Sequence, residues 1–326
     1  MYDAGFPGPE AFQDQMDDIP GWAWVGFCIT LLVLLTIDLY SHRGQHQRSR
    51  RQDVMWSVLW ISTGLSFTFF VWALMGRDAA EEYLAAYLIE ESLSLDNLFV
   101  FLLVFQTLRI PLENQRKALL WGIVGALVFR GIFIFVGVAA MARWQWIQYV
   151  FGALLFIAAL RAVREPKDEA VESRLVKWLS RHLPMSTDRE SPRLLVRENG
   201  KLLVTPLLVA IVGLELSDIL FAIDSVPAAL SVTRREFLVY SSNAFAILGL
   251  RSLYVVLIAS LEKVRYLHYG LAAVLAFAAF KMVTHDWIPV PPLLSVAIIV
   301  AILAITTAVS LRLAPAERPR DAAGKR

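Results

Sequence analysis

Residues 83–107 read YLAAYLIEESLSLDNLFVFLLVFQT. A helix of this length rises about 1.5 Å per residue and therefore crosses a hydrocarbon core of about 30 Å. The run nevertheless holds three acids, Glu90, Glu91 and Asp96, with Asn97 beside the last. Ionisable side chains are costly inside a membrane and are usually functional there. The stretch therefore predicts a membrane helix that carries a polar site.

The rest of the chain repeats this pattern of long apolar runs. None shows the two-residue alternation of a barrel strand, so we expect an all-α, polytopic membrane protein with about nine transmembrane helices. The expected spans are residues 20–40, 54–75, 83–107, 118–140, 146–163, 203–226, 238–260, 267–283 and 290–311.

Composition excludes several other classes. The 326 residues are 57% hydrophobic and only 18% charged, which does not fit a pair of soluble domains. A net charge of +2 and the high apolar content do not fit a disordered chain. The single cysteine, Cys28, permits neither an intrachain disulfide nor a thiolate metal cluster.

Basic residues are distributed unequally between the two sides of the expected membrane. Of the 31 Lys and Arg residues, 24 fall in connections or at span ends on one side of the expected membrane and 5 on the other, with Arg130 and Arg251 deeper inside spans. The positive-inside rule then places the N-terminus outside and the C-terminus in the cytoplasm. Because this sorting accounts for the basic charge, the sequence gives no reason to expect a nucleic-acid partner.

Three consecutive spans recur at offsets of 122, 121 and 120 residues. An odd number of spans per unit means that the second copy enters the membrane from the opposite face, which predicts two inverted three-helix repeats like those of many secondary transporters. The matching segments are LDNLF at 95–99 with SDILF at 217–221, ALVFR at 126–130 with ILGLR at 247–251, and residues 149–161 with 269–281.

The expected organisation follows from these spans. The 164–202 linker is either a regulatory segment or a solvated connection between the two repeats. In chain order the parts are an acidic extracytoplasmic tail 1–19, peripheral spans at 20–75, the first repeat 83–163, the cytoplasmic linker 164–202, the second repeat 203–283, a ninth span 290–311 and a basic cytoplasmic tail 312–326.

Ionisable residues inside the spans are the strongest indication of function. Acids outnumber the two arginines, so ion pairing with Arg130 and Arg251 cannot satisfy all of them, and the excess needs protons or a cation. Carboxylate, amide and carbonyl oxygens suit Mn²⁺, Mg²⁺ or Ca²⁺. We favour a divalent-cation pathway; a proton or sodium relay and a purely structural network are the alternatives. The candidate metal ligands are Glu91, Asp96, Asn97, Glu215, Asp218, Asp224 and Asn243.

Helical geometry separates these candidates. At about 100° per residue, Glu215 and Asp218 share one face of their helix, whereas Asp224 lies opposite Glu215. Pro227 follows closely, so the helix either unwinds and swings Asp224 toward the site, or simply ends near the outer surface. We expect Glu90 to face an outer vestibule. Asn243 is either a ligand or a residue that hydrogen-bonds neighbouring helices.

Enzymatic function is not expected. The chain has no nucleotide-binding glycine loop, and neither a Ser-His-Asp arrangement nor a His-Glu-x-x-His motif. A membrane hydrolase that uses a carboxylate-bound metal lacks an evident nucleophile or general base.

Three motifs carry a family resemblance: ESLSLDN at 91–97, FAIDSVPA at 221–228 and SNAFAILGLR at 242–251. With them the chain resembles the TerC family of integral membrane proteins, and within it the Alx-type manganese exporters, over most of its length. The resemblance implies manganese efflux across a bacterial inner membrane, with the acids inside the spans as the ion site. The family is also associated with tellurium resistance and with metal supply to exported proteins.

The main hypothesis is therefore a secondary transporter that exports Mn²⁺ by alternating access. Mn²⁺ is the expected transported ion, and H⁺ or Na⁺ is a possible coupling ion. No prosthetic group is expected. Membrane lipid is the expected surrounding of the chain. The alternatives are a membrane factor that supports assembly or metal loading of exported proteins, and a cation exchanger of the Ca²⁺/H⁺ type.

Overall fold

A computed structural model gives the structure of most of the chain. It describes residues 19–41, 50–144, 146–164, 178, 183–186, 188, 191–198, 201–258, 267–284, 287–288 and 290–312. Both expected tails and much of the expected linker lie outside this range. Within the helices, the side chains of Asp96 and Arg251 also lie outside the described set.

The long helices coincide with the expected spans. The described residues form α2 (Gly21–Ser41), α3 (Arg50–Met75), α4 (Arg77–Leu108), α5 (Leu112–Arg143), α6 (Ile147–Arg164), α8 (Pro206–Leu230), α9 (Glu236–Ile258), α10 (Leu267–Val283) and α11 (Pro292–Arg312).

Five of these helices, α2, α3, α5, α8 and α11, are long and apolar enough to cross a membrane. Three more, α6, α9 and α10, contain shorter apolar segments, and α4 is long but carries the acids of its central turns. The expectation of an all-α, polytopic membrane protein is confirmed.

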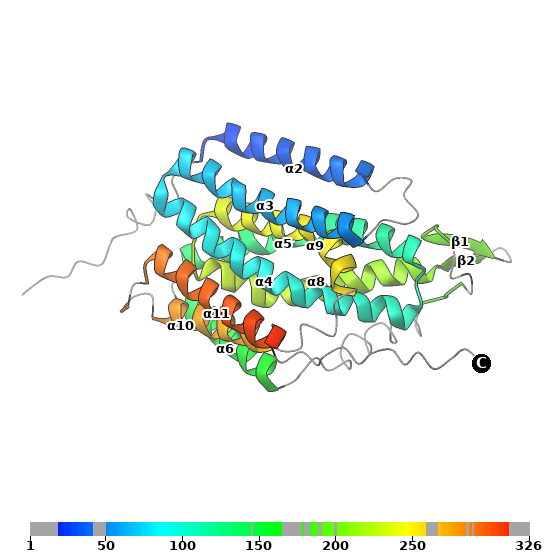
Figure 1. Ribbon diagram of the computed structural model, residues 1–326. Coiled ribbons are helices and arrows are strands. Elements are labelled where there is room, and N and C mark those ends of the chain that lie inside the picture. The colour runs from blue at the N-terminus through cyan, green and yellow to red at the C-terminus, as the bar shows by residue number, and fades with distance from the viewer. Residues whose placement is uncertain are drawn as a thin grey trace, which may run out of the picture.

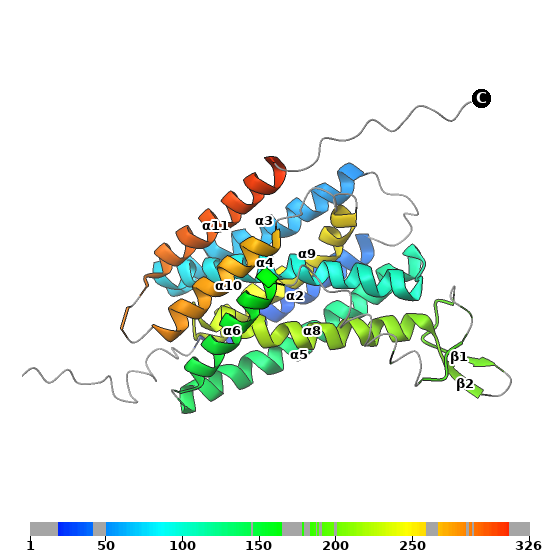
Figure 2. The ribbon, with the colours of Figure 1, turned by 90° about the horizontal axis from the view of Figure 1, so that it is seen from below.

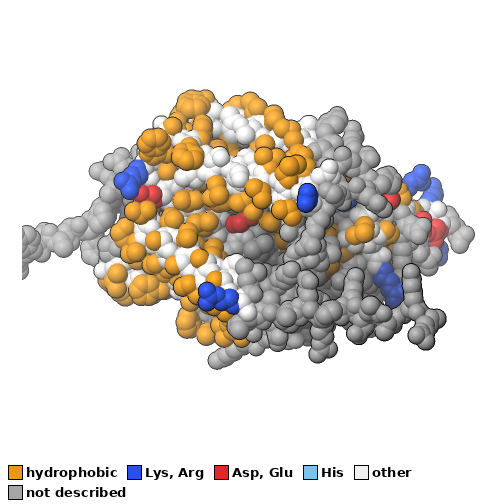
Figure 3. All heavy atoms as spheres, viewed as in Figure 1, with side chains coloured by type: hydrophobic (Ala, Val, Ile, Leu, Met, Phe, Trp, Pro, Cys, Tyr) orange, Lys and Arg blue, Asp and Glu red, His pale blue; other side chains and the backbone are white. Residues whose placement is uncertain are grey.

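The outer surface of the bundle is apolar. Leu32 of α2, Phe69 of α3 and Val136 of α5 are each more than 60% exposed. Among the described residues on the face shown in Figure 3, hydrophobic side chains predominate. A soluble bundle would bury such residues, so this surface is suited to contact with lipid.

The centre of the described bundle is built from six helices, the ones that the sequence assigns to the two expected repeats. Helix α4 packs on α8 and α9, α5 packs on α8 and α9, and α6 packs on α10 (Figures 1 and 2). The counterpart of α4 is α8, that of α5 is α9 and that of α6 is α10. If each helix is exchanged with its counterpart, the same pairs of neighbours result. The remaining helices α2, α3 and α11 lie at the periphery, where α3 covers α4 and α9, and α11 covers α4 and α10.

Corresponding helices of the two expected repeats run in opposite directions. Thr233, just past the end of α8, donates a hydrogen bond to Glu82 at the start of α4. Tyr254 near the end of α9 donates to Gln115 at the start of α5. Gly152 near the start of α6 contacts Val283 at the end of α10. This antiparallel arrangement is compatible with an inverted repeat, which stays a prediction from the sequence.

A short hairpin adds to the helical fold. Strands β1 (Leu195–Glu198) and β2 (Lys201–Val204) pair antiparallel, so residues 203–204, expected at the start of a span, belong to a strand instead. Helix α8 then begins at Pro206, where Thr205 Oγ1 accepts a hydrogen bond from the Leu208 amide. A proline in the first turn and a threonine cap are both typical helix starts.

The end of the expected linker is attached to the bundle. The Asn114 side chain donates to the Ser191 carbonyl at 3.4 Å, and Lys117 Nζ donates to the Pro192 carbonyl. Both donors belong to the first turns of α5. The described end of this segment is therefore held against the helices rather than fully solvated.

Candidate functional site

The polar centre of the bundle is organised around Arg130 of α5, whose side chain is fully buried. Its Nη1 lies 2.9 Å from Glu90 Oε2 of α4, and its Nη2 lies 2.9 Å from Asp218 Oδ1 of α8. Its Nε also donates to both oxygens of Asp218 at 3.2 Å. One guanidinium thus joins the first helices of the two expected repeats. We call Arg130, Glu90, Asp218 and Asn97 the Arg130 cluster.

Asn97 completes the Arg130 cluster. With its amide oxygen turned toward α5, it accepts a hydrogen bond of 2.9 Å from Arg130 Nη2, and its amide nitrogen donates to the Leu93 carbonyl at 3.3 Å. Asn243 of α9 interacts with the Glu90 carboxylate. Even so, neither Glu90 Oε1 nor Asn243 Nδ2 makes a well-formed hydrogen bond to another described residue.

The sequence of α4 explains why Glu90 belongs to this cluster. Glu90, Ser94 and Asn97 are spaced four and seven positions apart and therefore share one helix face. All three are buried, and Glu90 is 0% exposed. The expectation that Glu90 faces an outer vestibule is therefore wrong. Its spacing from Asn97 was the signal that could have identified it.

Glu215 lies one helical turn before Asp218 on the same side of α8, close enough for the two carboxylates to interact. A Cβ atom built on Gly125 of α5 would lie 2.0 Å from Glu215 Oε1, so this carboxylate occupies the space that a side chain at position 125 would fill. Its Oε2 is buried without a hydrogen-bond partner among the described residues. Glu215 thus adds a second negative charge beside Asp218.

Two other expected ligands point elsewhere. Glu91 follows Glu90 but interacts with Tyr87, one turn earlier on α4. Asp224 interacts with Arg161 of α6, a helix that supplies no residue to the Arg130 cluster. Helix α8 continues through Pro227 to Leu230, so it does not unwind to bring Asp224 inward. Asp96 and Arg251 were also expected at the site, but their side chains lie outside the described residues.

The described side chains do not converge as a ready metal site. No group of three His, Cys, Asp or Glu residues within the described part of the chain is placed to hold an ion. Instead, the carboxylates of Glu90 and Asp218 point at a guanidinium. Chemically, this arrangement offers a surplus of hard oxygen ligands around one fixed positive charge.

An apolar exterior, long helices and a buried charged centre define a polytopic integral membrane protein. The comparisons with known proteins narrow this class. The model of the integral membrane protein TerC family matches residues 75–318, and the chain belongs to that family.

Relatives match along nearly the whole chain. An uncharacterized membrane protein from Myxococcus xanthus is 41% identical over 291 residues, which cover 88% of this chain and 91% of the relative. A protein named "Putative membrane-bound redox modulator Alx" from Escherichia coli K12 is 38% identical over 87% of this chain and 92% of its own length. An uncharacterized membrane protein from Rickettsia bellii is 32% identical over 86% of this chain and 94% of its own length. No solved structure matches the chain.

Proposed function

We propose that this protein is a secondary transporter that exports Mn²⁺ from the cytoplasm by alternating access of its two three-helix units. The observation that carries the proposal is the excess of carboxylates around Arg130, the one guanidinium that the described residues place in the buried centre. Glu90 and Asp218 pair with Arg130, and Glu215 lies beside Asp218 with an unpaired buried oxygen. Three carboxylates against one arginine leave negative charge that a divalent cation would neutralise.

Arg130 has a specific part in this proposal. In the described conformation its guanidinium supplies the positive charge that the carboxylates of α4 and α8 require. An arriving Mn²⁺ would compete with Arg130 for Asp218 and would be drawn first to Glu215, which has no ion-pair partner among the described residues. The carboxylates would then be neutralised by Mn²⁺ when the ion is bound and by the Arg130 guanidinium when it is not. In neither state would their negative charge stay without a positive partner.

The location and the choice of ion complete the proposal. The bacterial relatives fit an inner-membrane protein, with the N-terminus outside and the C-terminus in the cytoplasm as the basic residues predict. Oxygen ligands favour Mn²⁺, Mg²⁺ or Ca²⁺ as a class, and the resemblance to manganese exporters selects Mn²⁺ and the direction of transport. The coupling ion would be H⁺ or Na⁺.

The printed name of the Alx relatives suggests a redox role for those proteins. The chain has a single cysteine, Cys28, which lies exposed on α2 and cannot form an intrachain disulfide. We therefore propose that a redox effect of this protein would be indirect, through the supply or removal of a metal ion. A factor that loads metal into exported proteins remains the second candidate function.

The first experiment compares Glu215→Gln with Glu113→Gln in cells that lack other manganese exporters. Glu215→Gln removes the charge of a half-buried carboxylate and breaks no ion pair among the described residues, whereas Glu113 lies exposed in the first turn of α5. We expect Glu215→Gln cells to accumulate manganese and lose manganese tolerance. Asp96→Asn and Asp218→Asn are expected to do the same, and Glu113→Gln to behave as the unmodified protein.

Protein level in the membrane is measured in parallel, because a variant that fails to insert would mimic loss of transport. Full manganese tolerance in cells that carry Glu215→Gln or Asp218→Asn at normal membrane levels would contradict the proposal.

A further inference from the structure

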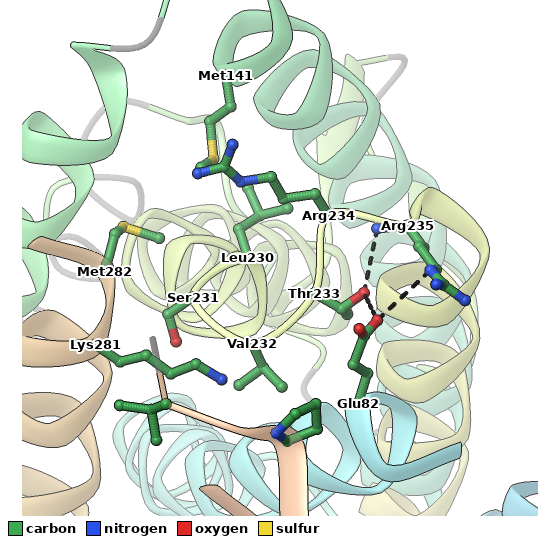
Figure 4. A pocket seen from close by; sticks show the side chains of 12 residues that line it. Glu82, Met141, Leu230, Ser231, Val232, Thr233, Arg234, Arg235, Lys281 and Met282 are labelled. Carbon is green, nitrogen blue, oxygen red and sulfur yellow. Dashed lines mark hydrogen bonds and ion pairs between the residues drawn. The ribbon is translucent and has the colours of Figure 1, made fainter. Parts of the chain in front are cut away.

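A second polar site lies at the end of the bundle where α4 begins and where α5, α8 and α10 end. It is a pocket of about 210 Å³. Its walls come from the start of α4, the end of α5, the connection from α8 to α9 and the end of α10 (Figure 4). None of the residues of the Arg130 cluster lines it.

The charge of this pocket is mainly positive. Arg234, Arg235 and Lys281 line it, and Glu82 is the one carboxylate among its lining residues. Glu82 is already engaged, because it accepts a hydrogen bond of 2.6 Å from Thr233 and lies 3.7 Å from Arg235 Nε. Figure 4 shows these contacts together along one wall of the pocket. The carboxylate is therefore directed toward Arg235.

Lys281 is the buried cation of the pocket. Its residue is 5% exposed, and its Nζ donates a hydrogen bond of 2.9 Å to Ser295 Oγ of α11. It makes no close ion pair with a described residue, but the Glu82 carboxylate of α4 interacts with it electrostatically across the pocket. His285 and Asp286 of the adjoining connection lie outside the described range. Arg234 donates to Gln148 Oε1 at 2.9 Å. A buried ammonium with a neutral partner is costly unless a negative charge is close.

We propose that this pocket binds an oxyanion, a phosphate group in chemical class, held between Lys281 and Arg234. A guanidinium and an ammonium are the two side-chain groups that proteins use most for phosphate oxygens. Among the described lining residues, Glu82 is the one carboxylate beside three cationic side chains, so the anion would add negative charge to a pocket that is mainly positive. Because the walls come from both expected repeats, the bound group would tie the two units together at this end. The inference does not depend on which cation the protein transports.

Inorganic phosphate and the headgroup of an anionic lipid offer the same phosphate chemistry. The test therefore uses two probes on the purified full-length protein in neutral detergent. One is inorganic phosphate at low millimolar concentration, compared with chloride at equal ionic strength. The other is phosphatidylglycerol, compared with phosphatidylcholine. A ligand that binds the folded state raises the melting temperature.

Lys281→Met keeps the length and apolar stem of the side chain and removes its charge. Lys201→Met is the matched control, because Lys201 is an exposed lysine of strand β2. Phosphate or phosphatidylglycerol is expected to raise the melting temperature of the unmodified protein and of Lys201→Met, and to leave that of Lys281→Met unchanged. The probe that produces the shift identifies the source of the phosphate group.

Two further variants protect the test against a misfolded Lys281→Met protein. Arg234→Gln should weaken binding at least tenfold. Glu82→Gln should tighten it, because it removes the one carboxylate that repels the anion. Equal shifts in the unmodified protein and Lys281→Met would overturn the proposal. It would also be overturned if neither phosphate nor phosphatidylglycerol shifted the melting temperature of the unmodified protein.

Discussion

At the scale of single residues, the buried centre is a balance of charges in which Arg130 is the counter-charge for two helices. It is paired with Glu90 and Asp218 at 2.9 Å each, and its residue is fully buried. Buried ion pairs of this kind add little net stability compared with apolar packing. Removing one partner is nevertheless expensive, because the remaining charges stay buried and uncompensated.

Arg130→Met should therefore destabilise the protein strongly, by about 3–5 kcal/mol if the cost resembles that of other broken buried pairs. The measurement is thermal unfolding of the purified protein in detergent. A control combines Arg130→Met with Glu90→Gln and Asp218→Asn, which makes the whole cluster neutral and should recover much of the loss. Unfolding of Arg130→Met at the temperature of the unmodified protein would contradict this interpretation of the Arg130 cluster.

A second prediction concerns the glycine that accommodates Glu215. In Gly125→Ala, the new methyl group would lie 2.0 Å from Glu215 Oε1 and must displace that carboxylate. The displaced atom is the end of a flexible side chain, so we expect near-normal thermal stability together with impaired Mn²⁺ transport.

Gly122→Ala is the control for this prediction, because a methyl group there meets Leu214 at an ordinary distance of 3.7 Å. It should transport normally. Normal transport by both variants would show that the position of the Glu215 carboxylate does not matter.

The sequence indicated many of these residues but not how they meet. Asp218, Asn97 and Arg130 were found because charged and amide groups stand out in an apolar helix. Glu90 was expected at an outer vestibule because its neighbour Glu91 was taken to face the site. Which of two adjacent residues faces inward depends on how the helix is rotated about its own axis. Rotation is set by packing against α5 and α8, which a single sequence does not reveal.

At the scale of elements, close packing of α6 and α10 depends on a small residue. A Cβ atom on Gly152 of α6 would lie 2.4 Å from Val283 Cγ2 of α10. Small residues allow membrane helices to approach closely, and without a hydrophobic driving force in lipid this packing contributes much of their association.

Gly152→Ala should therefore destabilise the protein by about 1–3 kcal/mol, the usual cost of overpacking. Val283→Ala provides room for the added methyl group, so the double variant should be more stable than Gly152→Ala alone. Thermal unfolding of the four proteins forms a double-mutant cycle. Strictly additive effects would show that the two residues do not share the contact.

The sequence predicted the helices closely and missed the hairpin. Long apolar runs have one stable form in lipid, so each expected span overlaps a described helix, although the bounds differ by up to six residues, as at the starts of α4 and α5. The strands Leu195–Glu198 and Lys201–Val204 are four residues each and carry mixed charges. Such short segments show no usable period, so a single sequence does not reveal them.

At the scale of the whole molecule, the six central helices alternate in direction across the bundle. The starts of α4, α6 and α9 lie at the same end of the bundle as the ends of α5, α8 and α10. An odd number of crossings would place the two termini on opposite sides, and the excess of basic residues selects the cytoplasmic side for the C-terminus.

Fusions at each terminus test this orientation. Alkaline phosphatase should be active when joined to the N-terminal side and inactive at the C-terminus, and a fluorescent protein that folds only in the cytoplasm should give the reverse result. Activity of the same reporter at both termini would contradict nine crossings.

The central claim is that the protein itself moves Mn²⁺. The most direct measurement is Mn²⁺ flux into liposomes that contain only the purified protein, with Glu215→Gln and Glu113→Gln reconstituted in parallel and imposed H⁺ or Na⁺ gradients. The account predicts protein-dependent flux that Glu215→Gln abolishes and Glu113→Gln retains. Absence of flux from folded, correctly inserted protein under every gradient, or equal flux from the unmodified protein and Glu215→Gln, would contradict it.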